Sequence, residues 1–337
     1  MKKAVVADAT LRNCDPVECP LGFKEKIEIV KQLDRLCVDV IETAPLLNGK
    51  SDVLFLHTIS SLLNNKVLSC AVPLNESLLN DTILAVKSAA RPRLNILAPV
   101  STVQMEYHCH QKPAVVLEKI SSLVCKAKAA GIEVEVSLVD ATRAEKDFLV
   151  SAVKQALSNG ADIITLCDSA GLMLPEELNT FISELYNSVP ELSDITLSVE
   201  CSDELHMAPA CAVACLRAGA EQIKTTIGIS GKLQLEAFAD ILRIKGAALD
   251  ISTSLNRTAC GKIVNQIEAL VNGKNIPQKQ GKEFHGGNHG DWKLTNSDGM
   301  PEVAEAVKKL GYELSADDLA NVFEDFQRIS QKKDLGS

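Results

Sequence analysis

The chain has 337 residues, 46% of them hydrophobic, which is enough to bury a large core. Its formal net charge of −9 disfavours nucleic acids and anionic membranes as the main partners. No apolar run approaches the ~20 residues of a membrane-spanning helix, and Asp8 and Arg12 interrupt the N-terminal segment before it reaches the length of a signal peptide. The eleven cysteines lie mostly within apolar segments, as free thiols do in a reducing compartment, so we expect a cytoplasmic protein.

Short β-branched runs alternate strictly with longer amphipathic stretches over the first 250 residues. Strands are predicted at residues 3–8, 38–43, 66–72, 93–99, 132–138, 161–167, 195–201 and 221–227, and helices at 23–36, 52–64, 77–89, 113–130, 144–158, 175–188, 203–218 and 231–246. Many strands are apolar on both faces, as in a parallel sheet covered by helices, and several helices end at a glycine, as at Gly131, Gly160 and Gly219. Eight such units predict an α/β protein with a (β/α)8 TIM barrel. A doubly wound open sheet is the alternative, but the first turn lacks its GxGxxG pattern.

The pattern changes after residue 250. A helix is predicted at 257–272, a polar and glycine-rich loop at 275–299, and two closing helices at 301–310 and 315–332. We therefore expect a barrel domain over residues 1–250, followed by a linker and a small helical subdomain over residues 251–337.

Polar side chains follow the predicted strands at the end of the barrel where catalytic groups lie in this fold. They are Asp8, Thr10, Arg12, Asn13, Cys14, Asp15, Glu42, Ser101, Gln104, Asp140, Arg143, Asp168, Ser169, Glu200, Ser202, Asp203, Glu204, Thr225 and Thr226. The two cations Arg12 and Arg143 suggest a pocket for a small anionic molecule, because a guanidinium group matches a carboxylate. The alternative is that these charges pair with one another.

Two segments carry residue types that can bind metal. His108, Cys109 and His110 form one group, and His285, His289 and Asp291 form another. Alternate histidines can bind zinc, but in loops they are more often surface residues, and the glycine-rich second segment is also typical of a plain connector.

Several motifs together resemble the α-isopropylmalate synthase and homocitrate synthase family. The opening VVADATLRNCDP resembles the family's DTTLRDGEQ-like motif, VEVSLVDATR its fifth strand, CDSAGLMLPEE its sixth strand and turn, and SVECSDELHMA its SVHCHNDLGMA motif. The segments KEKIEIVKQLDRLCVDVIETAP, NILAPVSTVQMEY and LTNSDGMPEVAEAVKKLGY continue the resemblance in the same order over nearly the whole chain. We expect no C-terminal regulatory domain.

The resemblance implies a metal-dependent Claisen condensation. In that reaction a divalent metal acts as a Lewis acid on a bound 2-oxo acid, and acetyl-CoA supplies the enolate nucleophile. It also implies a homodimer, or a heterodimer with a relative, formed through the helical subdomain. The catalytic residues it implies are Arg12, Asp168 and His289, and the substrate-binding residues are Arg12, Glu42, Arg143 and Thr226.

The metal ligands of the family are replaced in this chain. Its aspartate falls on Asn13, and its HxH pair falls on Glu200 and Ser202. A glutamate of the fifth-strand motif falls on Val139, and the glycine-rich GxGERxGN loop is shortened to GISGK at 228–232. Amide and hydroxyl oxygens are poorer ligands than carboxylate or imidazole, so we expect a divalent metal to bind poorly and condensation to be altered or weak.

Three hypotheses follow. The first is a divergent condensing or lyase enzyme with a re-tooled pocket that uses Arg12, Glu200 and Asp168, with His289. The second is a non-catalytic paralogue that acts as a partner subunit or as a sensor of a small molecule. The third is a thiol-based metal site built on Cys14 with Cys167 or Cys201, although strand alternation predicts that Cys201 points away from Glu200 and Ser202.

Overall fold

The computed structural model describes residues 2–14, 21–47, 49–256 and 258–273, together with Met300, Pro301 and Ala304. The chain divides into two compact units, residues 1–276 and 277–337. The helix predicted at 257–272 is confirmed as α10 (Cys260–Val271), and it packs on α2 and α9. The division between the units therefore follows α10, whereas the sequence placed a boundary at residue 250.

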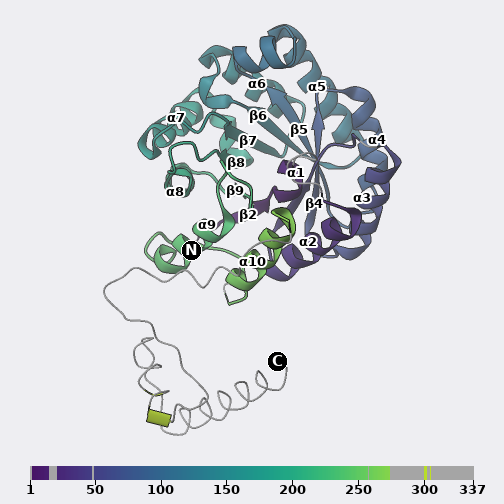
Figure 1. The fold of residues 1–337 in the computed structure, drawn as a ribbon. Helices are drawn as coiled ribbons and strands as arrows, with labels where there is room; N and C mark the ends of the chain where they lie inside the picture. Colours follow the sequence, from purple (N-terminus) through teal and green to yellow (C-terminus); the bar gives the residue numbers. More distant parts are fainter. Residues whose placement is uncertain are drawn as a thin grey trace. The chain divides into compact units, whose positions relative to one another are not determined.

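Eight parallel strands form a closed barrel, as the sequence predicts (Figure 1). They are β2 (Val5–Asp8), β3 (Val40–Thr43), β4 (Val67–Pro73), β5 (Pro92–Pro99), β6 (Glu133–Val139), β7 (Ile163–Asp168), β8 (Thr196–Cys201) and β9 (Gln222–Thr225). The barrel closes where β2 pairs with β9, with Val5 beside Gln222 and Asp8 beside Thr225. The strands follow one another around the barrel in chain order. Because all eight are parallel, their C-terminal ends lie at the same mouth of the barrel.

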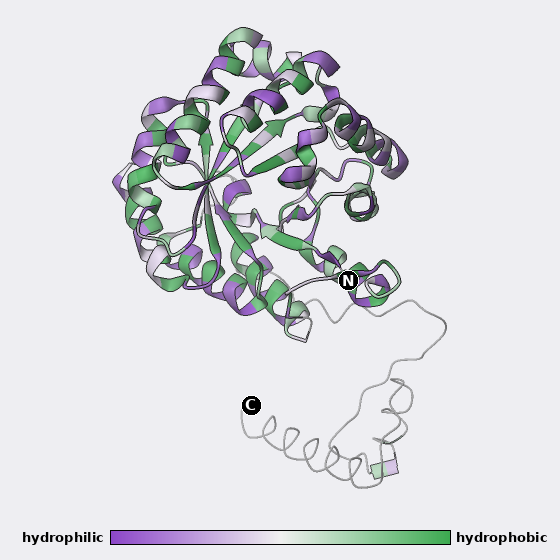
Figure 2. Cartoon of the chain, turned by 180° about the vertical axis from the view of Figure 1, so that it is seen from behind, coloured by the Kyte–Doolittle hydropathy of each residue, from purple (hydrophilic) through white to green (hydrophobic). Residues whose placement is uncertain are grey.

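Helices surround the barrel. They are α2 (Phe23–Leu36), α3 (Lys50–Leu62), α4 (Glu76–Val86), α5 (Pro113–Ala129), α6 (Lys146–Ser158), α7 (Pro175–Ser188), α8 (Ala208–Ala218) and α9 (Leu235–Lys245). Figure 2 shows that these helices carry both hydrophobic and hydrophilic residues, as amphipathic helices on a barrel do. The glycines expected to end helices at 131, 160 and 219 all have positive φ. No helix in the described part of the chain is long and apolar enough to cross a membrane.

Short elements complete the first unit. They are β1 (Lys2–Lys3), which pairs with β10 (Ile251–Ser252), the one-turn helix α1 (Thr10–Asn13), and the irregular helices at Val103–His108, Ala141–Arg143 and Pro190–Asp194. In the first turn after β2, the chain forms α1. Of the helix predicted at 301–310, only Pro301 and Ala304 are described, and both are helical. The loop predicted at 275–299 and the helix predicted at 315–332 lie outside the described residues.

Apolar and polar side chains occupy different layers of the barrel. The main hydrophobic core lies between the strands and the surrounding helices and includes Ile41, Leu94 and Phe238. Alternate residues of each strand point into the barrel, and many of these inward residues are polar or charged. Lys224 on β9 contacts Glu42 on β3 and Glu135 on β6, and these strands do not pair with β9. The contacts therefore cross the interior.

Candidate functional site

The first strand delivers Arg12 to the barrel mouth through a tightly tied turn. Asp8 ends β2 and accepts hydrogen bonds from the Thr10 backbone N–H (3.0 Å) and hydroxyl (3.1 Å). The Thr10 hydroxyl in turn accepts a bond from the Ile227 backbone N–H (2.9 Å), just beyond β9. These bonds fix α1 against the end of β9, and they therefore fix the backbone position from which the Arg12 side chain extends.

Arg12 is held between two carboxylates from distant strands. Its Nη1 lies 2.8 Å from Glu42 Oε1, and its Nη2 lies 2.5 Å from Glu200 Oε1. The Arg12 side chain is only 10% exposed. Burial alone would raise the pKa of Glu200, but the charges of Arg12, Lys232 and Lys224 outweigh burial and hold that pKa well below its usual range. The site therefore keeps Glu200 ionised.

A second group of charges lies deeper in the barrel. Lys224 Nζ is 2.6 Å from Glu42 Oε2 and 2.7 Å from Glu135 Oε1. Glu135 also contacts Arg93 Nη1 (3.3 Å) and accepts a bond from the Thr165 hydroxyl (2.5 Å). Burial opposes ionisation of Glu135, but Lys224 and Arg93 lower its pKa to about 2. Each charge in this second group has an opposite charge within contact distance, as burial requires.

The sequence analysis singled out Arg12, Glu42 and Glu200 but missed the charges below them. Arg93, Glu135 and Lys224 lie within barrel strands, where charged residues are rarely buried unless they are paired. A charged residue in the middle of a predicted barrel strand is the signal that could have identified them.

The three positions at which the resemblance expects metal ligands carry side chains that are engaged in other contacts. Asn13 Nδ2 donates to the Ala9 carbonyl (2.8 Å). Lys232 Nζ lies 3.1 Å from Glu200 Oε1 and 3.1 Å from the Ser202 hydroxyl. One carboxylate and two neutral side chains, with an ammonium group between two of them, do not fit a divalent cation. Among the described residues no group of three His, Cys, Asp or Glu side chains could hold a metal.

The other expected site residues are engaged within the protein. Arg143 makes paired contacts with its neighbour Asp140, Nε to Oδ1 and Nη2 to Oδ2, both at 2.8 Å. This is the self-pairing alternative raised from the sequence. Asp168, at the end of β7, accepts a bond from the Thr142 hydroxyl (2.8 Å). Thr226 is buried, with its hydroxyl 3.5 Å from the Leu233 carbonyl.

Some predictions fall outside the described residues. His289 and Asp15 are among them, as are His285 and Asp291. The histidines at 108 and 110 are described and exposed, and His110 Nδ1 lies 2.9 Å from the Glu106 carbonyl. His108 ends the irregular helix Val103–His108 and His110 follows it, so both are surface residues, as the non-metal alternative expects.

The thiols near the mouth are poor candidates for ligands. Cys167 Sγ lies 3.9 Å from Glu200 Oε2, and burial and the Glu200 charge raise the pKa of Cys167 to about 12. A hydrogen bond with Cys215 on α8, together with burial, raises the pKa of Cys201 as well. Cys201 also belongs to the core outside the barrel, as strand alternation predicts. Burial therefore disfavours the thiolate form of both cysteines, and the thiolate is the form that binds metal.

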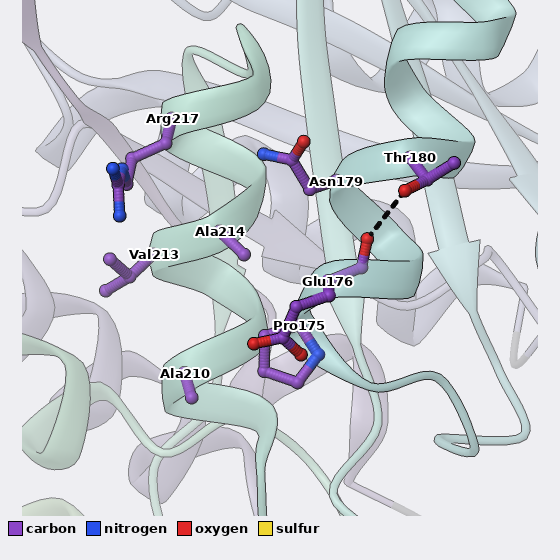
Figure 3. A pocket seen from close by; sticks show the side chains of 8 residues that line it. All are labelled: Pro175, Glu176, Asn179, Thr180, Ala210, Val213, Ala214 and Arg217. Atoms are coloured by element: carbon purple, nitrogen blue, oxygen red, sulfur yellow. Dashed lines mark hydrogen bonds between the residues drawn. The ribbon is translucent and has the colours of Figure 1, made fainter.

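Two cavities lie beside the mouth, over α7 and α8. One, of about 550 Å³, runs between the two helices and is lined by Pro175, Glu176, Asn179, Thr180, Ala210, Val213, Ala214 and Arg217 (Figure 3). The other, of about 520 Å³, shares Pro175, Glu176 and Ala210 and reaches Met207 and Ile241. Neither is lined by Arg12 or by any carboxylate that contacts it.

Comparisons with known proteins define the class. The model of the HMGL-like family matches residues 4–267, and the chain belongs to this family. The chain is 28% identical to the 2-isopropylmalate synthase of Aquifex aeolicus, over 98% of this chain and 70% of the relative. It is 29% identical to the 2-isopropylmalate synthase of Bacillus thuringiensis strain Al Hakam, over 99% and 72%. The resemblance inferred from the motifs is thus confirmed.

Solved structures of the same fold include enzymes with other names. The hydroxymethylglutaryl-CoA lyase of Pseudomonas aeruginosa superposes with a TM-score of 0.68 at 16% identity, covering 81% of this chain and 94% of that one. The carboxyl transferase domain of Rhizobium etli pyruvate carboxylase, solved with pyruvate, superposes with a TM-score of 0.63 at 13% identity, covering 81% and 48%. At these identities the likeness shows a shared fold.

Proposed function

We propose that this chain is an isopropylmalate synthase-like protein that binds a small 2-oxo acid at the barrel mouth, and that its own barrel does not perform the metal-dependent condensation with acetyl-CoA. The similarity to 2-isopropylmalate synthases over nearly the whole chain supports the first half. The donor set at positions 13, 200 and 202 supports the second.

The observation that carries the proposal is the setting of Arg12. Its guanidinium is fixed by Glu42 and Glu200 at the mouth, so its orientation is set before a ligand arrives. A guanidinium has five N–H donors, and these two contacts leave donors for a carboxylate. Arg12 therefore supports anion binding even though the family's metal ligands are replaced.

The direct test measures binding and turnover together. Isothermal titration with linear and branched 2-oxo acids should detect binding to the wild-type chain, and chelation of metals should not change it. Release of free thiol from acetyl-CoA should not respond to Mn²⁺, Zn²⁺ or Mg²⁺. Thiol release that these metals raise to about 1 s⁻¹ or more, an ordinary enzymatic rate, would overturn the proposal, as would failure of every 2-oxo acid to bind.

A pair of variants tests the role of the arginines. Arg12→Gln should weaken 2-oxo acid binding about 10-fold or more, since a charge-assisted hydrogen bond contributes about 1.5–3 kcal/mol. Circular dichroism establishes that the variant folds. Arg143→Gln removes the other cation that the sequence proposed as a substrate contact. Because the Arg143 side chain is 45% exposed and pairs with Asp140, and not with the buried carboxylates that hold Arg12, we expect this variant to bind nearly as the wild type does.

A second candidate function is that of a partner subunit, and exposed apolar side chains favour it. Leu172, Leu174, Leu205 and Met207 lie on the loops after β7 and β8, and each is at least 41% exposed. Apolar side chains grouped on a surface are typical of protein interfaces. The partner we infer is a relative of the same family with a complete metal site.

Mass photometry tests this candidate. A mixture with a 2-isopropylmalate synthase from the same organism should contain a heteromer, and Leu172→Glu with Leu205→Glu should abolish it. Leu84→Glu, on the exposed side of α4, is the matched control and should not. If only separate species form, the partner function is rejected.

A further inference from the structure

Lys232 is fixed at the barrel mouth by the backbone around it. The segment between β9 and α9 crosses the end of β8, where Ser202 and Lys232 form an antiparallel bridge. The Leu233 backbone N–H donates to the Cys201 carbonyl (3.2 Å). The Lys232 side chain therefore leaves a backbone that is tied to the same strand end that carries Glu200 and Ser202.

The ammonium group of Lys232 lies between two positions at which the family places metal ligands. Its Nζ is 3.1 Å from both Glu200 Oε1 and the Ser202 hydroxyl. A divalent cation bound by oxygen or nitrogen atoms at these positions would lie about 2.0–2.2 Å from them. An ion there would meet the ammonium group at close range and be repelled by it.

The surrounding charges balance without an added cation. From the mouth down into the barrel, the four carboxylates of Glu42, Glu133, Glu135 and Glu200 face the four cations of Arg12, Arg93, Lys224 and Lys232. Removal of Lys232 would leave one negative charge in excess among these groups. The ammonium therefore supplies the charge that Glu200 needs in addition to Arg12.

We propose that Lys232 is a tethered cation that takes the place of the divalent metal in this barrel and that, together with Arg12, receives the carboxylate of the bound 2-oxo acid. The second part rests on the proposed function. An ammonium group has three N–H donors, of which Glu200 and Ser202 accept two. The Lys232 side chain is 24% exposed, so the third donor can reach a ligand in the mouth.

A metal-binding comparison tests the first part without any 2-oxo acid. The triple variant Asn13→Asp, Glu200→His, Ser202→His restores the family's ligands, and its affinity for Co²⁺ and Zn²⁺ is measured by titration and by the Co²⁺ absorption spectrum. Adding Lys232→Ala to the triple variant should raise that affinity at least about 10-fold, because it removes a positive charge adjacent to the ion. Adding Lys146→Ala instead is the control, since Lys146 is an exposed lysine of α6. Equal affinities with and without Lys232 overturn the proposal.

A single substitution keeps the test decisive if the triple variant does not fold. Lys232→His replaces the ammonium group by an imidazole next to Glu200. The variant then has two side chains that can bind a metal ion, whereas the wild type has only the carboxylate of Glu200. Purified Lys232→His should bind Co²⁺ measurably, whereas the wild type and Lys146→His should not. Stoichiometric Co²⁺ on the wild-type chain would contradict the proposal.

A ligand arm tests the second part. Lys232→Met should weaken binding of the 2-oxo acid about 10-fold, with the fold verified by circular dichroism. Equal binding by the wild type and Lys232→Met overturns the ligand role. If no 2-oxo acid binds the wild type, the proposed function and the ligand role both fall, while the metal comparison still decides whether Lys232 stands in for the cation.

Discussion

At the scale of single residues, the barrel interior is built around Lys224. Its side chain is 1% exposed and contacts Glu42 and Glu135, whose side chains are fully buried. Charges taken out of water are stable only when paired, so each member of this group depends on the others. Arg12 joins the group through Glu42 and brings it to the mouth. The site is therefore the upper end of a network that also holds the barrel together.

Substitution of Lys224 tests this dependence. Lys224→Met leaves Glu42 and Glu135 buried with fewer cations, and we expect the free energy of unfolding to fall by about 3–5 kcal/mol. Urea denaturation measures it. Lys146→Met breaks an exposed pair with Glu184 and should cost less than about 1 kcal/mol. The double variant Lys224→Met, Glu135→Gln should recover part of the loss, and equal losses for Lys224→Met and Lys146→Met would refute the network.

Asp8 makes stability depend on pH. Burial is the largest influence, and with the nearby charge of Glu42 it raises the pKa of Asp8 to about 7 against the hydrogen bonds of Thr10, which lower it. The folded state therefore binds a proton more tightly than the unfolded state, whose carboxyl has the ordinary pKa of 3.8. The contribution of Asp8 to stability is fully present below that ordinary value and is lost as the pH rises to about 7.

Replacement of the carboxyl by an amide should remove this loss. The melting temperature of Asp8→Asn minus that of the wild type should increase as the pH rises from 4 to 7. Asp81→Asn, at an exposed position of α4, serves as the control. Parallel curves of melting temperature against pH for Asp8→Asn and the wild type would show that Asp8 does not titrate in this range.

At the scale of elements, the loops after β7 and β8 position the mouth. Gly171, in the loop between β7 and α7, has φ +64. A Cβ atom there would lie 3.0 Å from the backbone of Glu204 and of Ser202. The two loops are therefore so close that only glycine fits at position 171 without a shift of the backbone. This close contact fixes the position of Ser202 relative to Lys232.

Gly171→Ala should disturb that approach. Positive φ alone costs a residue with a Cβ atom about 1–2 kcal/mol. Gly131 has φ +74 and no atom within 4 Å of where a Cβ atom would lie. The variant Gly131→Ala therefore measures the cost of positive φ alone. Gly171→Ala should lower the free energy of unfolding by more than Gly131→Ala does, because the backbone must also move. Equal losses in urea denaturation would mean that the loops yield freely.

At the scale of the whole molecule, the first unit has a complete core of its own. Its main hydrophobic core extends from Ala4 to Val271, within residues 1–276. A unit with its own core and closed barrel is expected to fold alone. The second unit contains His289, which the resemblance proposes as catalytic, outside the described residues.

Truncation after residue 276 tests this independence. The shortened chain should unfold cooperatively in urea, with a free energy of unfolding within about 1 kcal/mol of the value for the barrel transition of the full chain. Loss of cooperative unfolding would contradict it. If the truncated chain folds but no longer binds the 2-oxo acid, a role for residues 277–337 follows.

The sequence by itself determined the architecture and the edge at which chemistry would lie. Alternating strand and helix patterns depend on neighbouring residues, so the eight units were readable from local periodicity. Since parallel strands all end at one mouth, Arg12, Glu42 and Glu200 could be placed together before any coordinates were known. The motifs also singled out positions 13, 200 and 202 as those where the resemblance expects metal ligands.

Only the tertiary structure decided what these side chains contact. Lys224 and Glu42 are 182 residues apart, and they meet because strand register and barrel closure bring inward positions together across the interior. The sequence identified Lys232 only as the last residue of the shortened loop at 228–232, and the bridge to Ser202 showed that it lies beside Glu200. Long-range pairing of buried charges depends on the closed geometry of the barrel, and no local pattern of residues encodes that geometry.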